Sequence, residues 1–77
     1  MNNLEQIKTK AVQLYVSAYN VGGLRHLAEE TVKDFLNLYF GIHENISNVV
    51  YLSPAYHDLY QQLLIEGEEK YWEQKND

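Results

Sequence analysis

The 77-residue sequence predicts an all-α fold, a compact bundle of about four helices in a single domain over residues 1–77. Three observations predict it. Apolar residues recur at spacings of three and four along most of the chain, which is the period of an amphipathic helix. A glycine pair, two further glycines and the only proline divide these periodic stretches. The run of residues 48–52, which could be extended because it contains two adjacent valines, has no second strand with which to pair.

The first helix is predicted over residues 3–19, and the glycine pair Gly22-Gly23 is expected to end it by adopting left-handed backbone geometry. Its apolar arc is roughly 200° wide, whereas an ordinary surface helix carries a stripe of about 100°. A helix with such an arc is either central to the fold or one half of an interface, and the sequence leaves both interpretations open. The arc comprises Leu4, Ile7, Ala11, Val12, Leu14, Tyr15, Val16, Ala18 and Tyr19.

The second helix is predicted over residues 24–40 and is expected to stop at Gly41. Charged and amide side chains occupy its other side, and Phe40 alone falls outside the apolar face. This face therefore predicts which residues of the helix enter the core. It comprises Leu24, Leu27, Ala28, Thr31, Val32, Phe35, Leu36, Leu38 and Tyr39.

A short third element is predicted over residues 44–52, where a helix is preferred over an extended segment. Ser53-Pro54 is a strong helix start, with serine as the N-cap and proline at the first helical position. The fourth helix is predicted over residues 54–73. Gly67 costs about 1 kcal/mol in a helix interior, so the sequence allows the helix to end or bend there.

The charge and composition exclude several classes of function. The net charge is −5 and the six basic residues do not cluster, so neither nucleic acid nor an anionic membrane is an expected partner. Five of the eleven acids lie in the segment 66–77. No cysteine is present, which excludes disulfides and thiolate metal sites. The N-terminus does not resemble a signal peptide, and the default expectation is a cytoplasmic protein.

No catalytic constellation is found in the sequence. It contains no nucleophile elbow and no glycine-rich phosphate loop. The three histidines do not have paired metal-ligand spacings, although His43 and His57 are each followed by an acid. A metal-dependent enzyme using these two histidines is the weakest hypothesis. We predict no enzymatic activity, no metal and no cofactor.

The stretch YFGIHENISNVVYL, residues 39–52, raises an alternative. Within it, GIHENISNVV resembles the turn and recognition helix of bacterial repressors. This resemblance implies a small helix-turn-helix transcriptional regulator that uses residues 35–52, with base contacts from His43, Asn45, Ser47 and Asn48. A recognition helix normally contacts DNA with arginine, lysine, asparagine or glutamine. Residues 43–52 contain no arginine or lysine and include Glu44.

A different surface is predicted on the fourth helix. If this helix continues past Gly67, Ile65 and Trp72 lie on its outer side with Glu68 and Glu69 beside them. A large aromatic next to an aliphatic residue, ringed by charge, is typical of a binding hot spot. If the helix bends at Gly67, Trp72 instead returns to the core.

A regulatory or inhibitory role through protein–protein interaction is the preferred interpretation. We expect a small acidic non-enzymatic protein that forms a homodimer and binds another protein. The partner-binding candidates are the outer face of the fourth helix and, on the first helix, Val12, Val16 and Tyr19. In composition the chain resembles the accessory regulators and inhibitors that bacteria, phages and mobile elements carry.

Overall fold

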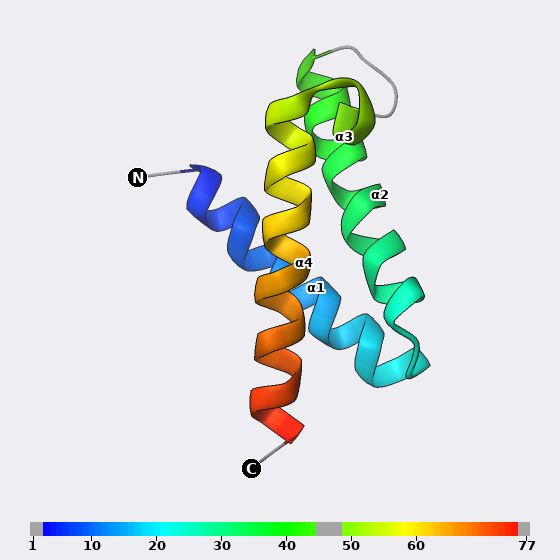
Figure 1. The fold of residues 1–77 in the computed structure, drawn as a ribbon. Coiled ribbons are helices and arrows are strands. Elements are labelled where there is room, and N and C mark those ends of the chain that lie inside the picture. The colour runs from blue at the N-terminus through cyan, green and yellow to red at the C-terminus, as the bar shows by residue number, and fades with distance from the viewer. Residues whose placement is uncertain (1–2, 45–48, 76–77) are drawn as a thin grey trace.

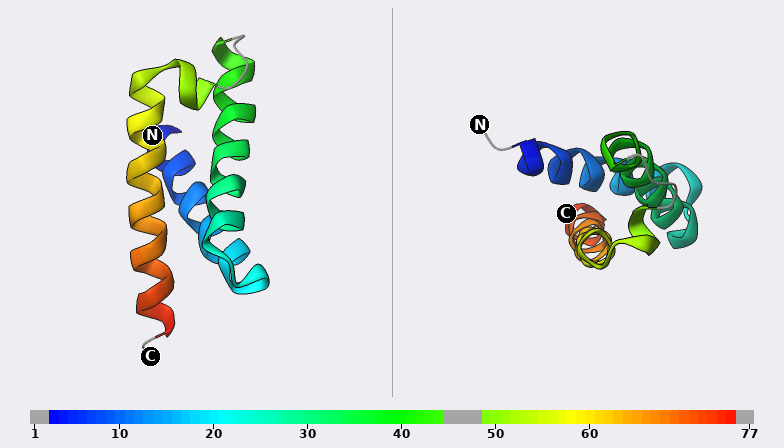
Figure 2. Two further views of the ribbon diagram at one scale, coloured as in Figure 1. Left: turned by 45° about the vertical axis from the view of Figure 1, so that its right-hand side comes forward. Right: turned by 90° about the horizontal axis from the view of Figure 1, so that it is seen from above.

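A computed structural model describes residues 3–44 and 49–75, and in this part of the chain every regular element is a helix. The elements are α1 (Asn3–Gly22), α2 (Arg25–Glu44), α3 (Val49–Leu52) and α4 (Pro54–Lys75). The predicted all-α fold is confirmed. Figure 1 shows α1 crossing behind α4, and in the left view of Figure 2 α4 and α2 lie on opposite sides of the molecule with α1 oblique between them. The short α3 joins α2 to the start of α4 (Figure 1).

The turn between α1 and α2 forms as the glycine pair predicts. Gly23 has a φ of 69°, in the left-handed region, and its amide donates to the Tyr19 carbonyl at 2.7 Å. The Leu24 carbonyl then accepts from the amides of Leu27 and Ala28, which opens α2. At the other predicted start, Pro54 begins α4 and the Ser53 carbonyl accepts from the His57 amide at 2.9 Å.

Of the two single glycines, Gly41 does not act as the sequence predicts, whereas Gly67 lies inside a helix as predicted. Gly41 is expected to end the second helix, yet α2 continues to Glu44. The fourth helix, predicted over residues 54–73, does continue through Gly67, and α4 extends to Lys75 without the end or bend that the sequence also allows. A glycine inside a helix costs only about 1 kcal/mol, and burial of neighbouring side chains outweighs this. Phe40 is buried just before Gly41, and Gly67 is itself buried against the Tyr15 ring.

The core explains the wide apolar arc of α1. This helix packs on α2 with one side and on α4 with another, so it needs more apolar surface than a helix with one neighbour. Tyr15 is fully buried at its centre, and Val16 is also buried. Val12 and Tyr19 are partly buried against the same cluster. The core cluster comprises Ile7, Ala11, Tyr15, Ala28, Val32, Leu36, Phe40, Val50, Tyr60 and Leu63.

The predicted core face of the second helix is partly wrong. The buried residues Ala28, Val32, Leu36 and Phe40 follow one another at intervals of four. Phe40, the residue that the pattern places outside, is 8% exposed and stacks on Tyr56 with ring centroids 4.3 Å apart. In contrast, Leu24, Leu27 and Leu38 are exposed. The reason is that α3 and the start of α4 pack on the Phe40 side of α2 and rotate the core toward it.

Two buried tyrosines predict how stability changes in alkali. Burial raises the pKa of Tyr15 and that of Tyr60 from 10.0 to about 12, and the Tyr60 hydroxyl donates to the Glu29 carbonyl at 3.3 Å. Because the folded state favours the protonated phenols, their contribution to stability is complete below pH 10 and is lost as the pH rises through about 12. In an alkaline titration followed by helical circular dichroism and tyrosinate absorbance together, some tyrosines should ionise well above pH 10, at the same pH at which the helices unfold. Ionisation of every tyrosine near pH 10 with the helices intact would contradict this prediction.

Candidate protein-binding surface

The two faces of α4 have different roles. Tyr60, Leu63, Gly67 and Tyr71, spaced three or four residues apart, are buried against the rest of the molecule. Because α4 is continuous through Gly67, residues on the opposite side remain in line with one another. The alternative in which Trp72 folds back into the core is therefore excluded by the course of the helix, and Trp72 is 47% exposed.

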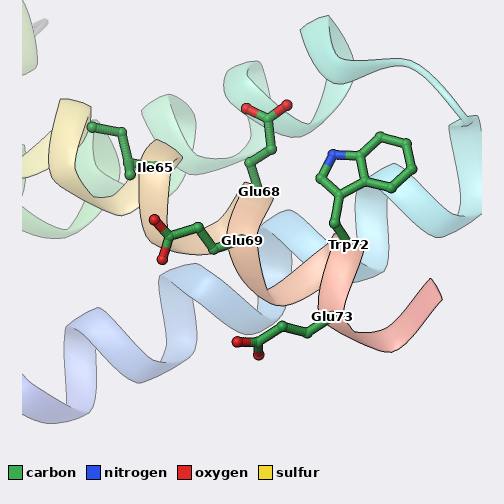
Figure 3. A pocket seen from close by; sticks show the side chains of 5 residues that line it. All are labelled: Ile65, Glu68, Glu69, Trp72 and Glu73. Carbon is green, nitrogen blue, oxygen red and sulfur yellow. The ribbon is translucent and has the colours of Figure 1, made fainter. Parts of the chain in front are cut away.

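The outer face of α4 carries an apolar pair surrounded by carboxylates. Ile65 is 60% exposed and lies two helical turns before Trp72. We call this patch the Trp72 surface; it comprises Ile65, Glu68, Glu69, Trp72 and Glu73, which line a shallow depression of about 510 Å³. Figure 3 shows Ile65, Glu68 and Trp72 projecting from one side of α4, with Glu69 and Glu73 beside them. The patch is preformed because all five side chains stand on one helix.

Aromatic contacts hold the Trp72 ring in place. Tyr19 of α1 stacks on Tyr71 of α4 with centroids 4.0 Å apart and planes inclined by 15°. The Trp72 ring packs edge-on against both, at 5.1 Å from Tyr71 and 6.4 Å from Tyr19. One part of the indole is thus supported by α1 while the rest stays in solvent. A fixed, half-exposed aromatic loses little conformational entropy when it is buried by a partner.

The charge of the Trp72 surface is negative. Glu68 forms an ion pair with Arg25 at the start of α2, and this carboxylate raises the pKa of Arg25. Within residues 3–44 and 49–75, no ion pair involves Glu69 or Glu73. Lys75 lies over the Tyr71 ring, 5.5 Å from its centroid. The exposed apolar pair is therefore flanked by at least two carboxylates that a basic partner could reach.

The candidate residues on α1 serve packing within the chain. Val16 is buried, and Val12 and Tyr19 contact the core cluster, so their surface is largely used by the monomer. Tyr19 nevertheless contributes to the Trp72 surface from below, through its ring contacts with Tyr71 and Trp72. The three residues do not form an exposed seam of their own.

The predicted helix-turn-helix geometry changes in the structure. The turn expected at Gly41 is absent, since α2 extends through His43 to Glu44. Asn45, Ser47 and Asn48 lie outside the described residues. The following helix, α3, has only four residues, and its Val50 is fully buried with its amide bonded to the Asn37 side chain at 3.0 Å. In residues 49–52, the described part of the predicted recognition helix, Val50 is therefore held in the core.

Two contacts that support the Trp72 surface were not predicted from the sequence. The ion pair between Arg25 and Glu68 joins residues 43 positions apart, and the stack of Tyr19 on Tyr71 depends on how α1 crosses α4. Neither has a local sequence pattern. One indication of such contacts is present in the sequence: it has seven tyrosines in 77 residues, and tyrosine is common at partly buried, partly solvated positions.

The structure and the comparisons give no catalytic or family assignment. Among the described residues, no three His, Asp or Glu side chains converge as a metal site. In the same part of the chain, none of the helices has the length and apolar character needed to cross a bilayer. Searches of protein-family models, curated proteins and solved structures find no match to this chain.

Proposed function

We propose that this chain is a small acidic regulatory or inhibitory protein that acts by binding another protein through the Trp72 surface. The observation that carries the proposal is the exposure of Ile65 and Trp72, 60% and 47%, on a rigid helix amid carboxylates. Fixed aromatic anchors with a polar rim are typical of the centres of protein interfaces. No catalytic chemistry is needed for such a role.

The charge of the surface indicates the chemistry of the partner. The chain has a net charge of −5, and Glu69 and Glu73 border the apolar pair. A complementary partner has an apolar pocket or groove for Trp72 with lysine or arginine at its rim. The rim charges should accelerate association and make it sensitive to salt, while the buried indole should provide most of the affinity.

The test compares proteins captured from an extract of the native cell by three forms of the chain. Wild type and the control Leu52→Ala, which truncates a 68% exposed leucine on α3, should retain the same protein. Trp72→Ala should lose it, with an affinity at least about 30-fold weaker once the captured protein is purified. Equal retention by Trp72→Ala and wild type would contradict the proposal.

The charge component has its own variant. Glu69→Gln/Glu73→Gln keeps the shape of the surface and removes two negative charges. It should weaken binding at low salt and flatten the dependence of the affinity on salt. An unchanged salt dependence would show that these carboxylates do not face basic groups of the partner.

A further inference from the structure

A second exposed apolar surface begins at Leu24, the residue before α2, and runs along that helix. Leu24, Leu27, Leu38 and Ile42 are exposed by 59%, 46%, 67% and 73%. Thr31 and Phe35 lie between them and are half-buried. At 100° per residue, all six fall within an arc of about 80° next to the core face. We call these six residues the α2 stripe. Figure 2 shows α2 at one edge of the molecule.

The stripe is continuous and lacks charge. It extends about 27 Å, from Leu24 to Ile42, at 1.5 Å per residue. The Thr31 hydroxyl donates to the Leu27 carbonyl at 2.8 Å, so its hydrogen bond is satisfied within the helix. Of the flanking acids, Glu30 is already paired with Lys33, whose Nζ lies 2.7 Å away. Asp34, which also borders the stripe and is exposed, has no ion pair among the described residues, so only part of the flank is neutralised by its own helix.

The residues of the stripe are spaced almost symmetrically about residue 33. Counted from residue 33, Leu24 and Ile42 lie nine positions away on either side, and Thr31 and Phe35 lie two positions away. Leu27 and Leu38 lie six and five positions away. In a twofold interface, a residue that lies a given distance on one side of the axis faces the residue of the other copy that lies the same distance on the other side in sequence. Two antiparallel copies of α2 therefore bring Leu24 against Ile42, Leu27 against Leu38 and Thr31 against Phe35.

The area of the stripe matches that of a stable dimer. The four exposed side chains present on the order of 400 Å² of apolar surface per protomer. A symmetric pair would bury about 800 Å² of apolar area, and such area makes up roughly 60% of an interface. The total of about 1,300 Å² lies within the range of about 1,200–2,000 Å² for specific complexes.

We infer that the protein forms a homodimer in which the α2 stripes of two copies pack antiparallel about a twofold axis near residue 33. The α2 stripe shares no residue with the Trp72 surface, although Arg25, which pairs with Glu68 of that surface, follows Leu24 of the stripe. It also differs from the dimer seam that the sequence suggests on the first helix, whose residues are used within the monomer. The exposed leucines of α2 then have a use that the monomer does not provide.

Sedimentation equilibrium of the full chain tests the dimer. Wild type should be a dimer at tens of micromolar, with an association that salt leaves unchanged or strengthens, since apolar contacts dominate. Leu38→Asp should be a folded monomer, whereas Leu52→Asp, which alters an exposed leucine on α3, should remain a dimer. A monomeric wild type, or a dimer that survives Leu38→Asp, would overturn the inference.

Disulfide trapping tests the antiparallel arrangement, because the chain has no cysteine of its own. Leu24→Cys/Ile42→Cys should form a covalent dimer under mild oxidation. Each single variant should not, since identical positions lie about 27 Å apart across the axis. Crosslinking by the single variants as efficient as by the double variant would overturn the arrangement. Trp72→Ala should dimerise normally, which separates failure of this inference from failure of the proposed function.

Discussion

Replacing Gly67 with alanine is expected to destabilise the protein, although alanine is the better helix former. A Cβ atom at this position would lie 2.6, 2.7 and 2.9 Å from Cγ, Cδ1 and Cβ of Tyr15. Tyr15 is fully buried between helices, so its ring and its Cβ have little freedom to move. Overpacking of this kind costs about 1–3 kcal/mol, against a gain of about 1 kcal/mol in helix propensity. Gly67→Leu should prevent folding.

A matched control separates steric overlap from helix propensity. Gly22 also lies in a helix, but a Cβ there would meet only the Leu27 side chain, chiefly its Cδ1 at 2.8 Å. Leu27 is 46% exposed and can rotate away. Gly22→Ala should therefore be close to neutral in urea unfolding monitored by circular dichroism. A Gly67→Ala variant more stable than wild type would show that α4 does not pack on Tyr15 as described.

Phe40→Ala should destabilise the protein far more than Leu38→Ala. The apolar pattern of the sequence, which places Leu38 in the core and Phe40 outside it, predicts the reverse. Phe40 is buried and stacked on Tyr56, so its truncation should cost about 3–5 kcal/mol. A domain of this size has roughly 3–5 kcal/mol of total stability, and Phe40→Ala should be largely unfolded at room temperature. Leu38 is 67% exposed, and its truncation should change the stability of the monomer by less than about 0.5 kcal/mol.

The comparison must be made on the monomer. Leu38 belongs to the α2 stripe, and dimerisation adds stability that depends on protein concentration. Urea unfolding of both variants should therefore be recorded at a concentration low enough for the monomer to dominate. A Leu38→Ala variant as unstable as Phe40→Ala would support the core face that the sequence pattern predicts and contradict the burial of Phe40 and the exposure of Leu38.

Local signals predicted the helices and most of their starts. The glycine pair and Ser53-Pro54 specify backbone geometry within a few residues, so the turn at Gly23 and the start of α4 were predictable. The continuation of α2 past Gly41 was not predicted, and the sequence left a bend at Gly67 open, because both depend on packing partners distant in sequence. The course of α4 through Gly67 in turn decides that Trp72 is on the surface.

The candidate surfaces were predictable only in part. Helical periodicity places Ile65 and Trp72 together once α4 is continuous, and the structure shows them exposed. Periodicity alone cannot divide the broad apolar face of α2 between core and solvent. Burial of Phe40 by Tyr56 makes that division, and it leaves Leu38 and Ile42 outside the core. The α2 stripe is consequently visible in the structure and not in the sequence.

Fluorescence of Trp72 tests the proposed protein-binding surface most directly. It is the only tryptophan in the chain and it belongs to that surface. Titration with the purified partner should shift its emission to shorter wavelength and protect it from acrylamide quenching, in step with binding measured independently. The apparent affinity should fall as salt is raised. Saturable binding that leaves the emission and quenching of Trp72 unchanged would contradict the proposal that this face of α4 binds the partner.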